Sequence, residues 1–231
     1  MPTTDLERTS LELVLPIQDA VFLARAGLGA VSKDDVTPII TGVLLTVANE
    51  EATVLSTDRY RVHRATRVVP EAAELPPMLL PARALRWLVA NAGFFGRASR
   101  LLVDPVVTFT FYPKPLEDPS KGSLPCPEGW VTIMIAEHRN EGASELSLSS
   151  KLIKGNYPPV GRLIDEALAK KGEPADGRFD MAHVTNVACL VEDRSERPEI
   201  RFVGASEKKP GQALFLFRSA VGLIQMAQYE R

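Results

Sequence analysis

The spacing of hydrophobic residues along the chain switches between the strand period and the helix period three times, each time in the same order. Each time, a short apolar strand precedes a helix with one apolar stripe, and strands separated by polar turns follow. In the first unit we expect a strand at Leu11 to Leu15, a helix with one apolar face, and a hairpin over Gly42 to Val47 and Thr53 to Thr57. The apolar face of that helix comprises Ile17, Ala20, Val21 and Ala24. Gly27 and Gly29 are expected to end the helix.

The second and third units repeat this pattern. The second has its helical stripe at Leu85, Leu88, Val89 and Ala92, and the third at Val184, Val187, Ala188 and Val191. The strands expected in the second unit are Met78 to Leu80, Leu101 to Val103, Val106 to Phe111, Val131 to Ile135 and Leu146 to Leu148. Those expected in the third are a start near Arg178 and Phe179, then Ile200 to Val203, Ala213 to Phe217 and Val221 to Met226. Pro113 to Gly129 is rich in Pro, Gly, Asp and Ser, which predicts an exposed loop between strands.

A unit with a single apolar stripe cannot bury that stripe alone. Pairs of units should therefore share antiparallel sheets with their helices packed on one face, which predicts an α+β fold. The charged, small-residue segment from Asp165 to Asp176 indicates a boundary. We expect one domain of two half-units over residues 1–164 and a single half-unit over residues 165–231.

The formal net charge of −2, from 27 basic and 29 acidic residues, argues against a protein that holds nucleic acid mainly by neutralising phosphates. A local basic surface stays open, and a protein that encircles DNA needs only weak contacts. Cys126 and Cys189 match no paired metal-ligand spacing, so we expect a reducing compartment, although a disulfide between them stays possible. The start of the sequence does not match a secretory signal, and no stretch has a membrane-spanning length. These features predict a cytoplasmic protein without membrane contact.

Three segments together resemble the beta sliding clamp of bacterial DNA polymerase III. TPIITGVLLTVANEEATVLSTDRYRVHRAT looks like a strand, hairpin and T-D-x-x-R-[LV] turn of the clamp's middle domain. SSKLIKGNYPPVGRLI resembles the strand and connector that end that domain, and GEPADGRFDMAHVTNVACLVEDRSERPEIRFVGASEKKPGQALFLF is similar to the second half of the last domain. The resemblance runs from about Leu11 to the C-terminus. No single motif is diagnostic, but the three occur in the family's order.

The resemblance implies a DNA-clamp-like fold whose helices face a central hole that encloses duplex DNA without sequence specificity. DNA polymerase and other replication or repair proteins would attach through short clamp-binding peptides, which raises processivity by effective concentration. Carried over position by position, the resemblance predicts a peptide pocket lined by Ile40, Thr57, Tyr60, Arg61, Val62, Pro158, Leu163, Leu223, Ile224 and Gln225. This pocket would bury the Leu or Phe anchors of the peptide. From the pattern alone, these residues also fit plain strand core and an ordinary turn.

The chain departs from the family in having three half-units where the family has six. A first domain is absent, and so is half of the last one, so ring closure needs a different arrangement of copies. Unpaired strand edges at the incomplete domain predict a homo-oligomer. The DNA-facing residues would be Arg25, Arg83 and Arg86, although each also fits an ordinary solvated position. The shortened, phage-type length and low basic content leave an alternative, a non-ring clamp mimic that acts as adaptor or decoy for clamp-binding peptides.

An enzyme is a further alternative, with Ser56, Asp58 and His63 as nucleophile and helpers. We expect these residues on one strand with alternating faces, and Asp58 as the cap of its own turn. His138 and His183 lack metal-ligand partners in the sequence, and the glycines at Gly27 and Gly29 lack the rest of a phosphate-binding loop. The sequence therefore predicts neither catalysis nor a metal or other cofactor.

Overall fold

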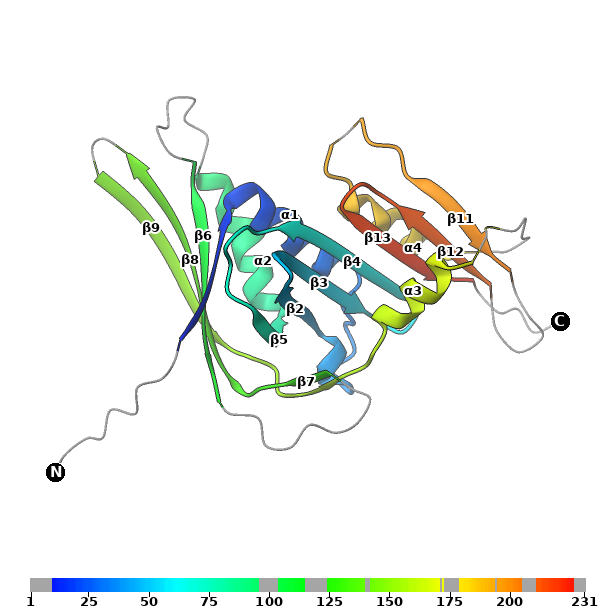
Figure 1. Cartoon of the computed structure of the whole chain (residues 1–231), viewed down its shortest axis with the longest axis horizontal. Coiled ribbons are helices and arrows are strands. Elements are labelled where there is room, and N and C mark those ends of the chain that lie inside the picture. The colour runs from blue at the N-terminus through cyan, green and yellow to red at the C-terminus, as the bar shows by residue number, and fades with distance from the viewer. Residues whose placement is uncertain are drawn as a thin grey trace.

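The computed structural model describes residues 10–95, 104–114, 124–139, 142–170, 172, 179–193, 195–204 and 211–226. Within these residues the strands form a four-stranded sheet, a seven-stranded sheet and a two-stranded ribbon, all antiparallel (Figure 1). The two larger sheets are built from the three repeated units that the hydrophobic pattern predicts.

The first two units exchange their leading strands. The first unit comprises β1 (Leu11–Pro16), α1 (Ile17–Leu28), β2 (Gly42–Ala48), β3 (Glu51–Thr57) and β4 (Arg61–Val68). The second comprises β5 (Leu75–Pro81), α2 (Ala82–Asn91), β6 (Val106–Pro113), β8 (Gly129–Arg139) and β9 (Gly142–Lys151). β1 pairs with β6 to give the order β1-β6-β8-β9, whereas β5 pairs with β2 of the first unit. Each unit therefore receives one edge strand from the other, which joins the two units around a shared core.

The third unit extends the larger sheet. It comprises α4 (Met181–Asn186), the 3₁₀ helix η3 (Val187–Leu190), β11 (Glu199–Val203), β12 (Gln212–Leu216) and β13 (Ala220–Gln225). Because β13 pairs with β4, one sheet runs in the order β11-β12-β13-β4-β3-β2-β5. The domain boundary predicted after residue 164 falls inside α3 (Gly161–Leu168), and the division into two domains stays a prediction.

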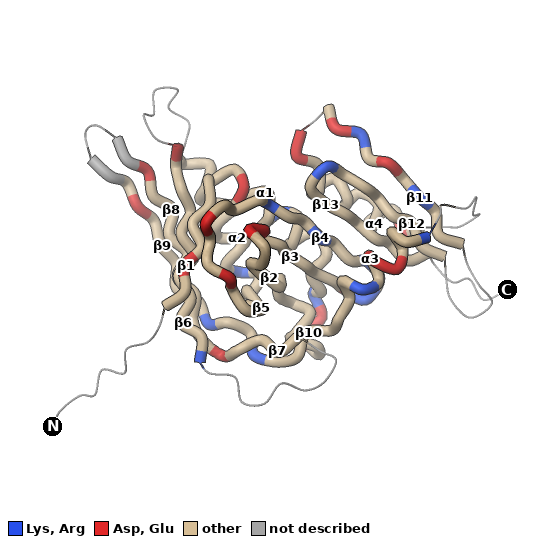
Figure 2. Tube along the Cα trace, in the orientation of Figure 1, with Lys and Arg blue, Asp and Glu red and all other residues tan. Residues whose placement is uncertain are grey.

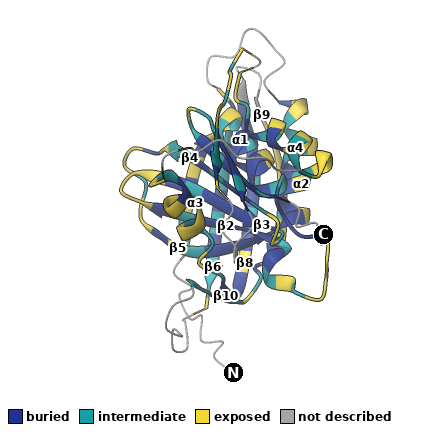
Figure 3. Ribbon diagram, turned by 90° about the vertical axis from the view of Figure 1, so that its right-hand side faces the viewer, coloured by how far each residue is buried: buried dark blue, intermediate teal, exposed yellow. Residues whose placement is uncertain are grey.

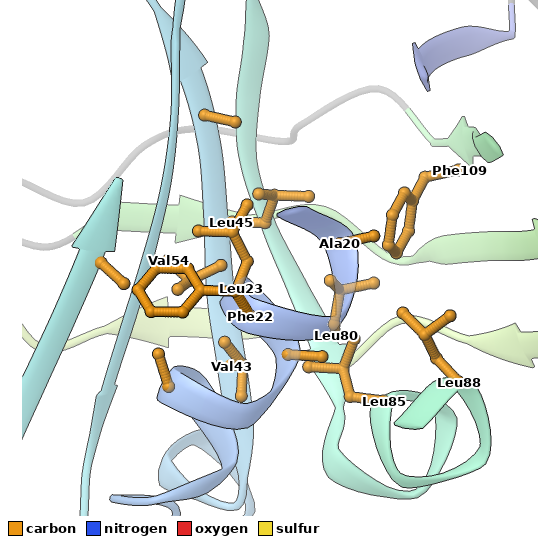
Figure 4. Close-up of a cluster of buried hydrophobic side chains, with 14 of the residues drawn as sticks. Ala20, Phe22, Leu23, Val43, Leu45, Val54, Leu80, Leu85, Leu88 and Phe109 are labelled. Atoms are coloured by element: carbon orange, nitrogen blue, oxygen red, sulfur yellow. The ribbon is translucent and has the colours of Figure 1, made fainter. Parts of the chain in front are cut away.

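The larger core lies between the helices and the sheets. Ala20 and Leu23 of α1 and Leu85 and Leu88 of α2 meet Phe109 of β6 in the interior (Figure 4). The seven-stranded sheet contributes Val43, Leu45, Val54, Leu80, Ala65, Ala213, Phe215 and Ile224 to the same core. Val187 and Leu190 of η3 close it at the third unit. We call this side of the molecule the helix face.

A second core covers the opposite side of the seven-stranded sheet, which we call the outer face. It contains Leu44, Leu55, Val62, Leu79, Leu214 and Leu223 of the sheet, together with Cys126, Tyr157, Ile164 and Ala167. Figure 3 shows α3 on the side of the sheet away from α2 and α4. The helices of the three repeated units, α1, α2 and α4, therefore share one face as expected, and α3, a helix that the sequence pattern did not predict, packs on the other face through Ile164 and Ala167.

Two expected local structures need correction. The predicted loop from Pro113 to Gly129 contains β7 (Leu124–Cys126), which pairs with β10 (Gly155–Tyr157) as Cys126 enters the outer core. No strand forms at Phe179, because this residue packs its ring 6.2 Å from that of Phe202 and precedes the helix cap Asp180. Leu101 to Val103 and Arg178 lie outside the described residues.

Candidate functional site

The residues predicted for a peptide pocket come from separate parts of the chain and meet where β4 pairs with β13. We call this place the joint. Leu223 lies opposite Val62 in the register, and the backbone N–H of Gln225 donates to the carbonyl of Tyr60 over 2.8 Å. The last described strand, β13, is therefore fixed to the Thr57 to Val62 turn by backbone hydrogen bonds.

A row of side chains crosses the outer face of the sheet at the joint. The register places Leu214, Leu223, Val62 and Thr57 opposite one another on four consecutive strands. Val62 and Leu223 are buried in the outer core, and the Thr57 hydroxyl donates to the carbonyl of Arg61 over 2.8 Å. This row forms an apolar floor rather than a polar or catalytic surface.

The turn between β3 and β4 is held by Asp58. Its Oδ1 accepts the backbone N–H groups of Tyr60 and Arg61 at 3.1 and 3.0 Å, as the capping role expected from the sequence requires. Arg59 has φ 80°, a conformation that favours glycine, so a glycine there would relax the turn. The Arg59 guanidinium reaches Thr37 and lies 3.7 Å from Asp34.

Two large apolar side chains remain exposed near the joint, one on α3 over the floor and one in the turn between β3 and β4, where it contacts α4. Tyr60 is 61% exposed and stacks on His183 of α4, with 5.9 Å between the ring centroids. Leu163 of α3 is 42% exposed, whereas the next residue, Ile164, is fully buried. Exposed apolar groups beside a buried apolar floor are suited to receive an apolar ligand group.

The connector is attached to the sheet by contacts that the sequence did not point to. Arg64 of β4 donates to Asp165 of α3 over 2.7 Å, and the Tyr157 hydroxyl donates to the carbonyl of Leu55 over 3.5 Å. The spacing of Ile164 and Ala167, three residues apart, was the signal in the sequence for a helix with its own apolar face.

The structure separates the remaining predicted pocket residues. Ile40 is buried in the 3₁₀ helix η1 (Pro38–Ile40), and Pro158 is half-buried next to Tyr157. Gln225 is half-buried and shares the face of Leu223 by strand alternation. Arg61 and Ile224 lie toward the helix face instead: Ile224 is in that core, and the Arg61 guanidinium is 2.8 Å from Asp58.

The three arginines predicted to face DNA are all exposed on α1 and α2. Arg83 lies with its guanidinium nitrogens 3.3 and 3.4 Å from the Ser150 hydroxyl. Arg83 and Arg86 line a hollow of about 560 Å³ that also receives Lys33 and Lys151, against a single acidic residue, Asp35. Arg25 lies in the last turn of α1. Elsewhere basic and acidic residues are interspersed along the chain (Figure 2), so this hollow is a local concentration of positive charge.

The candidate catalytic residues occupy an inaccessible place. Ser56 and His63 lie opposite each other on β3 and β4, so their expected placement on one strand is wrong, because the Asp58 turn reverses the chain between them. Ser56 is fully buried and His63 is 1% exposed, which leaves no path for a substrate. Among the described residues, no group of His, Cys, Asp or Glu is arranged to hold a metal ion.

The two cysteines are free and belong to different cores. Cys126 lies in the outer core and Cys189 packs against the helix-face core, so the sheet separates them. Burial raises the pKa of the Cys126 thiol to about 11 and that of Cys189 to about 12, so neither supplies a reactive thiolate near neutral pH.

Solved structures share this architecture. The chain superimposes on the DNA polymerase III beta subunit of Pseudomonas aeruginosa with a TM-score of 0.61 at 11% identity, covering 99% of this chain and 69% of that one. The chain has the bacterial sliding-clamp fold. The clamp-fold structures also include the Streptococcus pyogenes beta subunit, at a TM-score of 0.60 and 15% identity over 99% of this chain and 68% of that one. The Bacillus subtilis DNA polymerase sliding clamp matches at a TM-score of 0.54 and 14% identity, over 100% and 67%.

The α+β clamp fold expected from the sequence is thus confirmed, at identities at which the likeness concerns the fold. No protein-family model and no curated protein matches the sequence. In the described part of this clamp fold, none of the helices combines the length and apolar character needed to cross a membrane.

Proposed function

We propose that this chain is a clamp-like processivity factor, which tethers DNA polymerase and other replication proteins to duplex DNA through short peptides bound at the joint. The observation that carries the proposal is the joint itself, where Leu163 stays exposed on α3 over the buried floor of Val62 and Leu223, and Tyr60 stays exposed in the adjoining turn. Such a site binds by burying apolar anchors and needs no catalytic group.

The peptide site is tested with the Tyr60→Ala variant. We expect it to weaken binding of a labelled peptide with Leu and Phe anchors by about tenfold or more, as aromatic truncations at binding hot spots do. Fluorescence anisotropy measures the affinity. Trp130→Ala is the matched control, because Trp130 is 43% exposed on β8 of the other sheet. Equal losses in both variants would place the peptide elsewhere.

The DNA contact is proposed for the helix face, through Arg25 and the basic hollow beside α2. Lys33, Arg83, Arg86 and Lys151 put four cations around one hollow, so a phosphate there would be held by charge without a sequence-specific contact. The net charge of −2 keeps this attraction local, which suits a protein that must slide.

The basic hollow is tested by the salt dependence of DNA binding. In Arg86→Ala we expect the slope of log affinity against log salt concentration to fall by about one, and in Arg83→Ala/Arg86→Ala by about two, since each phosphate contact releases counterions. Arg162→Ala is the control, because Arg162 is exposed on α3 at the opposite face. An unchanged slope in both helix-face variants would contradict DNA contact at this hollow.

The non-ring clamp mimic makes a different prediction from the clamp. A specific observation favours it: α4, the helix of the third unit, contains neither Lys nor Arg. Retention on circular DNA that is lost when the DNA is linearised would establish a clamp. A monomer that binds the peptide but is not retained on circular DNA would establish the adaptor or decoy.

A further inference from the structure

Strand β1 has a free edge on the side that faces the seven-stranded sheet (Figure 1). In the described part of the chain it pairs only with β6. The N–H of Ile17 donates to the carbonyl of Pro105 over 2.9 Å, and antiparallel pairs alternate, so the odd-numbered residues of β1 exchange hydrogen bonds with β6. The N–H and C=O groups of Glu12 and Val14, and the carbonyl of Pro16, therefore point to the free edge.

A hollow of about 370 Å³ lies along this edge. It is lined by β1, by Asp19 of α1 and by residues 68–73 at the end of β4 and beyond it, and we call it the β1 groove. Two of its apolar side chains are well exposed, Val14 at 54% and Val68 at 67%. Val14 alternates with the buried leucines of the helix-face core, and Val68 shares the strand face of Val62, so both belong to the outer face.

The charged residues that line the β1 groove are all acidic. They are Glu12, Asp19 and Glu71. Asp19 is already paired, because its carboxylate accepts from the Arg67 guanidinium over 2.7 Å. Among the described residues, Glu12 and Glu71 form no ion pair. The groove therefore joins an apolar surface to two free carboxylates, which suits a ligand that is both apolar and cationic.

We propose that the β1 groove binds an extended basic segment of a partner protein, which adds to the free edge of β1 as an antiparallel strand. The backbone groups of Glu12 and Val14 supply hydrogen bonds, and the side chains that line the groove select the sequence. Residues opposite each other in a strand pair share a face, so the segment carries an apolar residue opposite Val14 and Lys or Arg opposite Glu12. One small residue separates these two. Glu12 also disfavours pairing with an acidic strand.

This inference goes beyond the proposed function and does not rest on it, because the β1 groove and the joint lie at opposite ends of β4. The strand runs from Arg61 at the joint to Val68 at the groove. Its eight residues span roughly 23 Å. A partner in the groove therefore leaves the peptide site at the joint free.

Backbone methylation of a peptide tests the strand addition. The probe is a fluorescein-labelled peptide, Val-Thr-Val-Thr-Arg, whose second Val lies opposite Val14 and whose Arg lies opposite Glu12. N-methylation of the second Val removes a donor to β1, so we expect affinity measured by anisotropy to fall about tenfold or more. N-methylation of the Thr before Arg should change it less than about twofold, because that N–H points away from β1. Equal losses in the two peptides would overturn the strand addition.

Substitutions in the protein test the place and the charge. We expect Glu12→Lys to weaken binding of this peptide by about tenfold or more, through repulsion of its Arg. Glu145→Lys is the matched control, because Glu145 is exposed on β9 at the other edge of the same sheet. Glu71→Gly should weaken binding about threefold without lowering stability, since Glu71 has φ 62°, a conformation that favours glycine. Equal losses in Glu12→Lys and Glu145→Lys would reduce the binding to unspecific attraction and overturn the site.

Two further results would also contradict the proposal. Loss of this peptide in Tyr60→Ala, with unchanged binding in Glu12→Lys, would place it at the joint and leave the proposed function intact. If the peptide does not bind, and Glu12→Lys abolishes a rise in mass of the unsubstituted chain with concentration, the free edge of β1 belongs to a second copy. Saturable binding that Glu12→Lys weakens and Tyr60→Ala leaves unchanged supports the β1 groove, whether or not the clamp role holds.

Discussion

Lowering the pH from about 7 to about 4 is expected to remove about 3 kcal/mol from the free energy of unfolding through one residue, His63. Burial lowers the pKa of this imidazole from 6.5 to about 4, because the charged form would lose its hydration. The side chain is 1% exposed, on β4 under the helix face.

The surroundings of His63 both raise and lower its pKa, and burial has the largest effect. Its Nδ1 lies 3.2 Å from the carbonyl of Ala26, a contact that raises the pKa, and 3.6 Å from the sulfur of Cys189. The Arg61 guanidinium lowers the pKa and the Asp58 carboxylate raises it. Among the described residues, Nε2 has no hydrogen-bond partner, so nothing on that side stabilises a second ring proton.

The direction of the change in stability with pH follows from the lowered pKa of His63. The folded state resists a proton that the unfolded chain accepts near pH 6.5, so the stabilisation is complete above that pH and is lost as the pH falls toward 4. Urea unfolding between pH 7 and 4 measures the loss. The slope of the free energy of unfolding against pH should become shallower in His63→Gln. It should persist in His183→Gln, because that imidazole is only half-buried beside Tyr60. An unchanged slope in His63→Gln would assign the acid sensitivity to other groups.

His63 also lies where the third unit meets the first. The ring of His63 and the sulfur of Cys189 fill the space beside Gly29, and a Cβ at Gly222 would lie 2.9 Å from Leu190 and 3.7 Å from His63. α1, η3 and β13 therefore meet around one imidazole. Protonation of His63 is expected to weaken this contact first, which makes the attachment of the third unit the acid-sensitive part of the fold.

The sequence could predict the three units because each has a local period. Of the predicted stripe, Ala20 and Ala24 are buried and Ile17 packs against the core, whereas Val21 is only half-buried and Leu23 takes a core position instead. The hairpin at Asn49 follows the expected turn, with positive φ at Asn49 and Glu50. The pairing of β1 with β6 and of β5 with β2 could not be inferred from the periods. Leading strands that stayed within their own units would bury the same apolar stripes as leading strands that are exchanged.

The candidate site was less predictable for a physical reason. Strand alternation separates Val62 from Arg61 and Leu223 from Ile224, so neighbours in the sequence face different cores. A resemblance carried over by position cannot resolve this without the register. The outer core was also hidden, because Cys126 and Tyr157 are far apart in the sequence and meet through the short ribbon of β7 and β10.

The Ile164→Ala variant is expected to lower the free energy of unfolding by about 2 to 5 kcal/mol. Ile164 is fully buried in the outer core, where it holds α3 against β4 and β13 together with Ala167. Truncation leaves a cavity that the sheet cannot close, since backbone pairing fixes the strands beneath it. The Arg64 to Asp165 ion pair offsets little of this loss, because Asp165 is 63% exposed on its side chain.

Leu163→Ala is the matched control, since it removes a similar side chain from the adjacent position. Leu163 is 42% exposed, so its truncation should cost less than about 1 kcal/mol of stability while it weakens peptide binding at the joint. Urea unfolding and peptide anisotropy, measured on both variants, should therefore give opposite rankings. Equal effects on stability would contradict the burial of Ile164 under α3. An unchanged peptide affinity in Leu163→Ala would remove the connector from the binding site, because Leu163 is the exposed large apolar residue of α3, which contacts β4 and β13 at the joint.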